Sequence, residues 1–241
     1  MARRRHLVIA LVAGLLIAAC GGDDDAAPVT EPATVDTAAV DTATGDPATG
    51  DTATGAGVEC PPVEGTAEPV RQFAGPPPDC LTAGVTYDAI VTTNKGEFTI
   101  ELDVEQGPVA ANNFVFLARN RYFDDTPCHR IIPNFVVQCG DPTGTGTGGP
   151  GYTIVDEPPA PGQYQLGSIA MAKTPAPDSA GSQFFIVIGS DGAALPPEYA
   201  LFGQVVEGLD STVAEMAAAG TPGQGTPSER ITIESVRIVE R

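Results

Sequence analysis

The stretch that decides the fold reads His129-Arg130-Ile131-Ile132-Pro133-Asn134-Phe135-Val136-Val137-Gln138. It has a counterpart further along the chain, Gly181-Ser182-Gln183-Phe184-Phe185-Ile186. Both are apolar, strand-like runs in which only a few side chains are polar. A charged side chain is rarely buried unless something requires it there, so the placement of Arg130 indicates a binding site.

The polar groups of these two runs suit the binding of a peptide segment. A guanidinium on one strand and the Gln138 amide on the next can hold the carbonyl or the nitrogen of a peptide group. The rings of Phe135 and Phe185 can hold a ring-shaped side chain beside them. An isolated arginine in a strand is usually part of a structural ion pair, but this combination favours a proline-binding site.

Apolar alternation predicts the rest of the fold. Residues 87–91 and 98–102 alternate on either side of a turn at Asn94-Lys95-Gly96, which predicts a hairpin. Helices are expected from Pro108 and over 209–219. Further strands are expected at 129–132, 135–139, 152–155, 167–172, 183–188 and 231–239, the last with a bulge between Ile233 and Val236. Many short strands and two helices predict a mainly β, antiparallel barrel with helical lids.

These residues also carry a resemblance to a known family. From about residue 86 to residue 241 the chain resembles the cyclophilin-type peptidyl-prolyl cis-trans isomerases, with motifs in the family's order and spacing. The matching motifs are Asn112-Asn113-Phe114, Phe-Asp-Asp-Thr-Pro at 123–127, 129–133, 138–141, 146–149, Met171-Ala172, 181–186 and Phe202-Gly203. The resemblance implies a closed eight-stranded antiparallel β-barrel capped by two α-helices, and an isomerase that requires no cofactor and no metal.

The resemblance also assigns roles to individual residues. Arg130 is the expected catalytic residue, which donates a hydrogen bond to the prolyl nitrogen of the substrate. The residues expected to bind substrate are Phe135, Val136, Gln138, Ala172, Lys173, Phe185, Leu195 and Tyr199. Of these, Ala172 and Lys173 are expected to act through their main chain.

The chain departs from the family's pattern at several of these positions. Val136 stands where methionine is common, and Lys173 stands where asparagine is usual. Near 193–199 many members carry a tryptophan and a histidine, whereas this chain has no tryptophan and has Tyr199 at the histidine's place. Tyr199 can still stack on a proline ring, so we expect catalysis to survive and cyclosporin binding to be weak.

Other interpretations of these motifs are weaker. The run at 144–149 fits a G-x-G-x-x-G phosphate loop, but a strand-like segment follows it where such a loop requires a helix. A hydrolase would use Cys128 or Ser182 with His129. Cys128 and His129, however, point to opposite faces of a strand, and Ser182 lacks a nucleophile elbow. A non-catalytic chaperone that binds proline-containing segments remains open, because the same pocket would serve it.

The N-terminal region predicts export. Residues 1–19 combine Arg3-Arg4-Arg5 with an apolar run, which is typical of a lipoprotein signal peptide. Cys20 is the expected lipidation site, and acyl chains there would anchor the protein to a membrane. Residues 20–59 contain no Lys, Arg or aromatic residue and repeat Asp-Thr-Ala-Thr-Gly, which predicts a disordered acidic tether. These features predict a location at the extracytoplasmic face of the cell membrane.

A Pro-rich connector at 60–83 joins this tether to the expected domain at 84–241. Cysteines of an exported protein are expected to pair. Cys60 and Cys80 bracket the connector, which has little else to hold it, so a disulfide between them is expected.

Cys128 and Cys139 flank the hairpin that carries Arg130 and Gln138. A two-residue turn would place the cysteines directly opposite each other. A shared face for Arg130 and Gln138 requires an odd turn, which would separate the cysteines. A bulge would reconcile both, and pairing of these two cysteines is slightly favoured.

The charge of the chain limits its partners. Acidic residues outnumber basic ones by 31 to 12, which gives a net charge of −19. Such a surface repels phosphate backbones, and no patch of Lys and Arg offsets it, so nucleic-acid binding is excluded. The expected partners are proline-containing exported polypeptides, and we expect a monomer.

Overall fold

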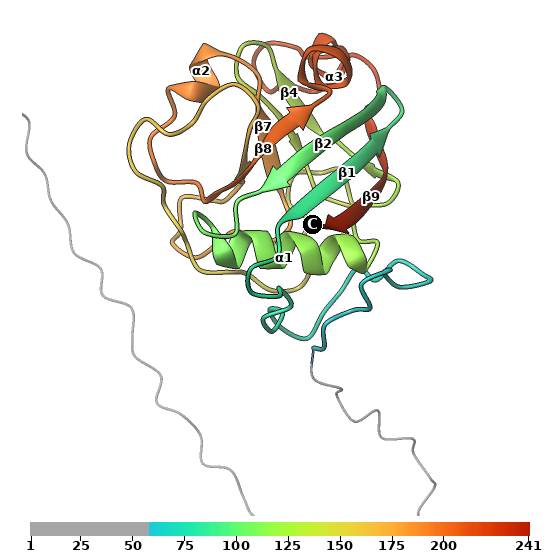
Figure 1. Cartoon of the computed structure of the whole chain (residues 1–241). Coiled ribbons are helices and arrows are strands. Elements are labelled where there is room, and N and C mark those ends of the chain that lie inside the picture. The colour runs from blue at the N-terminus through green and yellow to red at the C-terminus, as the bar shows by residue number, and fades with distance from the viewer. Residues whose placement is uncertain (1–57) are drawn as a thin grey trace, which may run out of the picture. The chain divides into compact units, whose positions relative to one another are not determined.

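The computed structural model of the chain describes residues 58–241 (Figure 1). The expected signal peptide at 1–19, the lipidation site Cys20 and the tether up to residue 57 lie outside the described residues. Within the described part, no helix is long and apolar enough to cross a membrane. The same part holds no cluster of His, Cys, Asp and Glu side chains suited to a metal ion.

Nine strands form one antiparallel sheet that curls into a barrel. They are β1 (Tyr87–Thr93), β2 (Gly96–Leu102), β3 (Thr126–Pro127), β4 (Arg130–Ile132), β5 (Val136–Cys139), β6 (Ser168–Met171), β7 (Phe184–Val187), β8 (Leu201–Glu207) and β9 (Thr232–Glu240). Their order in the sheet is β3-β9-β1-β2-β8-β6-β7-β5-β4. The predicted first hairpin is confirmed, since β1 and β2 pair around a turn in which Thr93 lies opposite Gly96.

The barrel closes through the short segment 126–132. At its start β3 pairs with β9, and at its end β4 pairs with β5. Between the two, the Cys128 N–H donates to the Ile231 carbonyl at 2.9 Å. β3 and β4 are therefore two ends of one bent strand. Counted together they give the eight-stranded antiparallel barrel that the family resemblance implied.

Helices cover opposite ends of the barrel (Figure 1). α1 (Pro108–Arg119) lies across one end and α3 (Ala214–Ala218) across the other. The Glu157 carboxylate caps α1 by accepting the N–H groups of Val109 and Ala110 at 2.9 and 2.8 Å. Phe114 of α1 joins the aromatic core, with its ring centre 5.0 Å from that of Phe123 and 5.3 Å from that of Phe184.

The C-terminal part agrees closely with the prediction. The helix expected at 209–219 begins as a π-helical turn, η1 (Leu209–Val213), and continues as α3. The bulge expected in the closing strand is confirmed at Glu234, because Thr92 pairs with Ser235 and Thr93 pairs with Ile233. A further one-turn helix, α2 (Ser190–Ala193), was not predicted.

The prediction of a strand at 152–155 is wrong. This segment makes only a single bridge, between Ile154 and Ala180. Pro150 precedes it and Pro158-Pro159 follow it, and since proline cannot donate to a ladder these residues limit the length of any strand here.

β8 was missed, because Gly203 interrupts its apolar pattern. A Cβ at this position would lie 2.8 Å from the Glu101 carbonyl oxygen on the paired strand β2. Glycine is therefore required here for the close approach of two strands and does not mark a turn.

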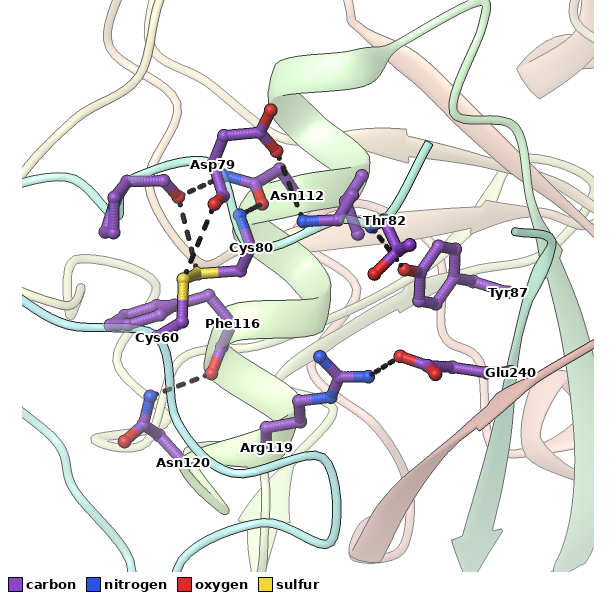
Figure 2. The surroundings of a disulfide bond; sticks show 12 residues. Cys60, Asp79, Cys80, Thr82, Tyr87, Asn112, Phe116, Arg119, Asn120 and Glu240 are labelled. Atoms are coloured by element: carbon purple, nitrogen blue, oxygen red, sulfur yellow. Dashed lines mark hydrogen bonds and ion pairs between the residues drawn. A yellow bond between two sulfur atoms is a disulfide. The ribbon is translucent and has the colours of Figure 1, made fainter. Parts of the chain in front are cut away.

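The connector is packed against the domain, contrary to the expectation that it has little besides a disulfide to hold it. Figure 2 shows the disulfide between Cys60 and Cys80 beside α1. The Cys80 N–H donates to Asn112 Oδ1 at 2.8 Å, and the Thr66 N–H donates to the Arg119 carbonyl at 2.8 Å. The connector therefore lies along α1 and is tied to it by main-chain and side-chain hydrogen bonds.

Removal of this disulfide is expected to destabilise the protein. The bond joins residues 20 positions apart, with Cα atoms separated by 5.5 Å. By chain entropy, opening a loop of this size costs about 3 kcal/mol of unfolding free energy. Denaturant unfolding of a Cys60→Ser/Cys80→Ser variant checks this value. An unchanged unfolding midpoint would mean that the packing contacts alone fix the connector.

Candidate active site

The hairpin of β4 and β5 places Arg130 directly opposite Gln138. Residues 133–135 connect the two strands, and this odd number puts both side chains on one face. Asn134 has a φ of +60°, in the left-handed region that tight turns use. The Phe135 N–H closes the turn with a hydrogen bond of 3.1 Å back to β4.

Cys128 and Cys139 form a disulfide next to this pair of side chains. The ladder between β4 and β5 ends at Arg130 and Gln138, and the Cys128 N–H pairs with Ile231. Cys128 therefore lies outside the hairpin, ahead of the first paired residue, Arg130. A shared face for Arg130 and Gln138 is therefore compatible with the disulfide, and the hairpin needs no bulge.

The shared face opens on a cavity of about 120 Å³. The residues that line it are Arg130, Phe135, Val136, Gln138, Ala172, Lys173, Phe185, Leu195 and Tyr199. They come from the β4–β5 hairpin, the end of β6, β7 and the loop before β8. The structure thus brings all the expected catalytic and substrate-binding residues together, while their individual roles stay predictions.

The Arg130 guanidinium is oriented by two contacts. Its Nη1 donates to Gln138 Oε1 at 3.2 Å, and its Cζ lies 5.5 Å from the centre of the Phe135 ring. Among residues 58–241 no carboxylate forms an ion pair with Arg130. Its remaining N–H groups can therefore donate to a ligand in the cavity.

Another part of the cavity wall is aromatic. The rings of Phe185 and Tyr199 have centres 5.5 Å apart and meet edge to face. The Tyr164 hydroxyl fixes Tyr199 from behind, because it accepts the Tyr199 N–H at 3.0 Å and donates to the Tyr199 carbonyl at 2.6 Å. The supporting role of Tyr164 was not predicted, since nothing in its sequence neighbourhood marks it.

Ala172 and Lys173 border the cavity just after β6. The Ala172 N–H already donates to the Gln183 carbonyl at 2.9 Å, so the Ala172 carbonyl is the main-chain group that this residue can offer to a ligand. The Lys173 ammonium forms an ion pair with Asp156 at 2.5 Å, which ties its side chain to the rim. This geometry is consistent with the expectation that Lys173 would act through its main chain.

Gln183 belongs to the site but was missed from the sequence. Its Oε1 accepts a hydrogen bond of 3.0 Å from Gln138 Nε2. Its own Nε2 donates to the carbonyls of Gly146 and Gly148 at 3.0 and 3.1 Å. These bonds fix the orientation of both amides, so that Gln138 Oε1 faces Arg130. The signal was available, because Gln183 is the amide in the second strand-like run.

Asp141 organises the loop that supplies these two carbonyls. It is fully buried, and its carboxylate accepts the N–H groups of Thr143, Gly146 and Gly148 at 2.7, 2.7 and 3.0 Å. Burial alone would raise the pKa of Asp141, but hydrogen bonds from the Thr143 side chain and from these N–H groups outweigh it and lower the pKa to about 2. The carboxylate therefore stays charged and holds the loop at neutral pH.

The cavity is continuous with two grooves, which share Lys173 with it. One groove, of about 360 Å³, is walled by the loop 146–150 and Tyr152, and it shares Gln138 with the cavity. Another, of about 520 Å³, runs past Asp156 and shares Tyr199. A polypeptide can therefore lie across the site with one residue in the cavity.

The structure removes the hydrolase alternatives. Cys128 is in a disulfide and has no free thiol. Ser182 is buried, and its hydroxyl donates to the Gly140 carbonyl at 2.7 Å and contacts the Tyr122 hydroxyl at 3.0 Å. Neither side chain can attack a substrate in the cavity.

The chain is similar to known proteins over this domain. The sequence profile of the family described as cyclophilin type peptidyl-prolyl cis-trans isomerase/CLD matches residues 89–238. A probable peptidyl-prolyl cis-trans isomerase B of Mycobacterium leprae is 36% identical over 205 residues, which are 76% of this chain and 67% of that protein. The chain spans only 52% of the protein of the same name from Mycobacterium tuberculosis, at 38% identity over 61% of this chain.

A solved structure agrees with the fold. The crystal structure of a Cryptosporidium parvum cyclophilin type peptidyl-prolyl cis-trans isomerase matches with a TM-score of 0.59 and 32% identity. The match covers 65% of this chain and 99% of that one. The structure of the same protein in the presence of the dipeptide Ala-Pro matches with a TM-score of 0.58.

Proposed function

Because the chain belongs to the cyclophilin-type peptidyl-prolyl cis-trans isomerase family, we propose that it catalyses the cis–trans isomerisation of X-Pro bonds in polypeptides. The observation that carries this proposal is the cavity that the Arg130 guanidinium lines together with the rings of Phe185 and Tyr199, where no carboxylate among residues 58–241 forms an ion pair with Arg130. An apolar ring can fill such a cavity while the guanidinium donates to the adjacent amide.

The proposed mechanism acts on the resonance of the X-Pro amide. Resonance holds the bond planar, with a barrier of about 18–20 kcal/mol. When the bond twists, the lone pair of the prolyl nitrogen is localised and becomes a better hydrogen-bond acceptor. A guanidinium hydrogen bond to that nitrogen therefore stabilises the twisted state more than either planar state. Gln138 and Phe135 hold Arg130 in place in advance, so little reorganisation is needed.

A non-catalytic chaperone would bind proline segments in the same cavity. It would need the apolar wall, but it would not need an oriented guanidinium. The relay from Gln183 through Gln138 to Arg130 therefore favours an enzyme. A protease-coupled prolyl-peptide assay of the full chain tests the proposal. Uncatalysed isomerisation takes tens of seconds or longer, and the protein is expected to accelerate it.

We also propose that the protein acts on exported polypeptides while anchored by lipid at Cys20. The support is the sequence pattern of a basic start, an apolar run and Ile17-Ala18-Ala19-Cys20. A Cys20→Ala variant is expected to lose its lipid and to move from the membrane fraction to the soluble one after cell fractionation. If the variant partitions with membranes as the wild type does, Cys20 is not the anchor.

Weak inhibition by cyclosporin is expected as well. Leu195 and Tyr199 line the part of the cavity where many family members offer a tryptophan and a histidine. A smaller apolar surface should bind a large apolar ligand less tightly. Titration of the isomerase activity should therefore require far more cyclosporin than a tryptophan-containing relative does. Equal potency in a parallel titration would contradict this.

A further inference from the structure

Two residues of the connector, Gln72 and Phe73, contact the loop 146–150. This loop walls the groove that shares Gln138 with the cavity. The Phe73 N–H donates to the Pro150 carbonyl at 2.9 Å, and Gln72 Nε2 donates to the Gly149 carbonyl at 3.0 Å. Both carbonyls belong to the loop 146–150 that lines this groove of about 360 Å³. The connector thus contacts the substrate groove from behind.

The contact is close and well supported. The Phe73 ring packs against Phe116 and Tyr152, with ring centres 4.8 and 6.1 Å apart. Tyr152 itself lines the groove. Gly151 has a φ of +95°, and a Cβ there would lie 2.9 Å from the Phe73 carbonyl oxygen, so the two chain segments meet without room for a side chain.

The connector is also fixed at this point to the body of the domain. Arg71 donates to the carbonyls of Tyr122 and Asp124, the second at 2.6 Å. Its guanidinium lies over the Tyr122 ring. Figure 2 shows the other attachment, the Cys60–Cys80 disulfide beside α1. Gln72 and Phe73 therefore lie between two anchored parts of the connector.

The loop is held from its other side by the residues of the site. The Gly146 and Gly148 carbonyls accept hydrogen bonds from Gln183, which orients Gln138. The same loop therefore receives hydrogen bonds from Gln183 at one end and from the connector at the other. A shift of the loop would change the width of the groove that it walls.

We propose that Gln72 and Phe73 are positioning residues that hold the loop 146–150 at the width needed to bind substrate residues next to the proline. This proposal rests on the proposed isomerase function. Both residues lie outside the matched range 89–238, so the connector adds a wall support that the family's common domain does not contain. The expected consequence is a selective effect on long substrates.

The test compares Gln72→Ala and Phe73→Ala in the full chain with wild type. Two substrates are used: an octapeptide with a central proline and the blocked dipeptide Ala-Pro, whose isomerisation is followed by NMR exchange. Loss of the Gln72 hydrogen bond should raise KM for the octapeptide about fivefold, with kcat unchanged. Phe73→Ala keeps its main-chain hydrogen bond and loses the ring contact with Tyr152, and a rise of similar size is expected. For the dipeptide, both KM and kcat of the variants should equal those of wild type.

Leu81→Ala is the matched control, because Leu81 is an apolar connector residue that packs on the core and is not among the residues that line the groove. It should lower the melting temperature and leave both KM values unchanged. Phe73→Leu, which keeps an apolar side chain, should restore most of the octapeptide KM. If Gln72→Ala and Phe73→Ala behave like Leu81→Ala, the connector is only a scaffold and the proposal is wrong.

Binding data separate this proposal from the proposed function. If the wild-type chain isomerises neither peptide, the positioning role is tested by the dissociation constants for the octapeptide, measured by calorimetry. Weaker octapeptide binding by Gln72→Ala than by wild type would still support the positioning role. Equal binding would overturn it.

Discussion

Replacement of Asp141 by alanine is expected to lower the free energy of unfolding by at least about 3 kcal/mol, because three hydrogen bonds to a charged acceptor are lost together. The carboxylate is fully buried and accepts hydrogen bonds from Thr143, Gly146 and Gly148. A hydrogen bond to a charged group contributes about 1.5–3 kcal/mol. Denaturant unfolding at neutral pH measures the loss.

The same carboxylate should make stability depend on pH. The pKa of Asp141 is about 2 in the folded protein and 3.8 in the reference state. A group whose pKa is depressed by folding stabilises the fold above its unfolded pKa and loses that contribution as the pH falls toward its folded pKa. The contribution is about 2 kcal/mol, present above about pH 4 and lost toward pH 2.

Asp141→Asn provides the control for this titration, because it removes the charge and keeps the shape. Other carboxylates titrate in both proteins, so the difference between wild type and variant isolates Asp141. Between pH 5 and pH 2 the wild type should lose about 2 kcal/mol more than the variant. If the free energies of unfolding of wild type and variant change with pH in parallel, Asp141 does not hold the loop through its charge.

Arg130→Ala is expected to reduce kcat/KM about a hundredfold, which corresponds to about 3 kcal/mol of lost transition-state stabilisation. The fold should survive, since the side chain is only half-buried and its hydrogen-bond partner Gln138 keeps its bond to Gln183. Arg130→Lys should restore little activity, because an ammonium lacks the planar fork. Thermal melts of each variant exclude unfolding as the cause.

Phe135→Ala serves as a contrasting variant. It removes the ring beneath the guanidinium and part of the cavity wall. Weaker substrate binding is expected, with a smaller fall in kcat than for Arg130→Ala. A well-folded Arg130→Ala protein with wild-type kcat/KM would contradict the mechanism, even if the family is correct.

The sequence predicted the hairpin site well because its signals are local. Arg130 and Gln138 lie in one apolar run, and the odd turn between them follows from their need to share a face. The bulge at Glu234 was also local, since it appears as a change of apolar parity along one strand. Such features depend on the strand period of two and need no tertiary information.

The remaining features depend on contacts between distant segments. In the sequence, Gly203 interrupts the apolar pattern of a strand. Only the structure shows that glycine is needed there, because the Glu101 carbonyl lies beside it. The sequence predicts a Pro-rich connector that has little besides a disulfide to hold it, yet Phe73 packs on Phe116 and Tyr152. As the one aromatic residue of the connector, Phe73 was the available signal. A fragment that begins at residue 84 would lack this packing.

In the proposed mechanism, Arg130 is the residue that makes a proline-binding cavity catalytic. NMR exchange spectroscopy of a proline peptide with the full chain tests it most directly, because binding and isomerisation give separate signals in one sample. Wild type should give cross-peaks between the cis and trans forms, and Arg130→Ala should bind the peptide with those cross-peaks strongly reduced. Peptide shifts on binding without cis–trans cross-peaks for wild type would contradict the account and indicate a binding protein.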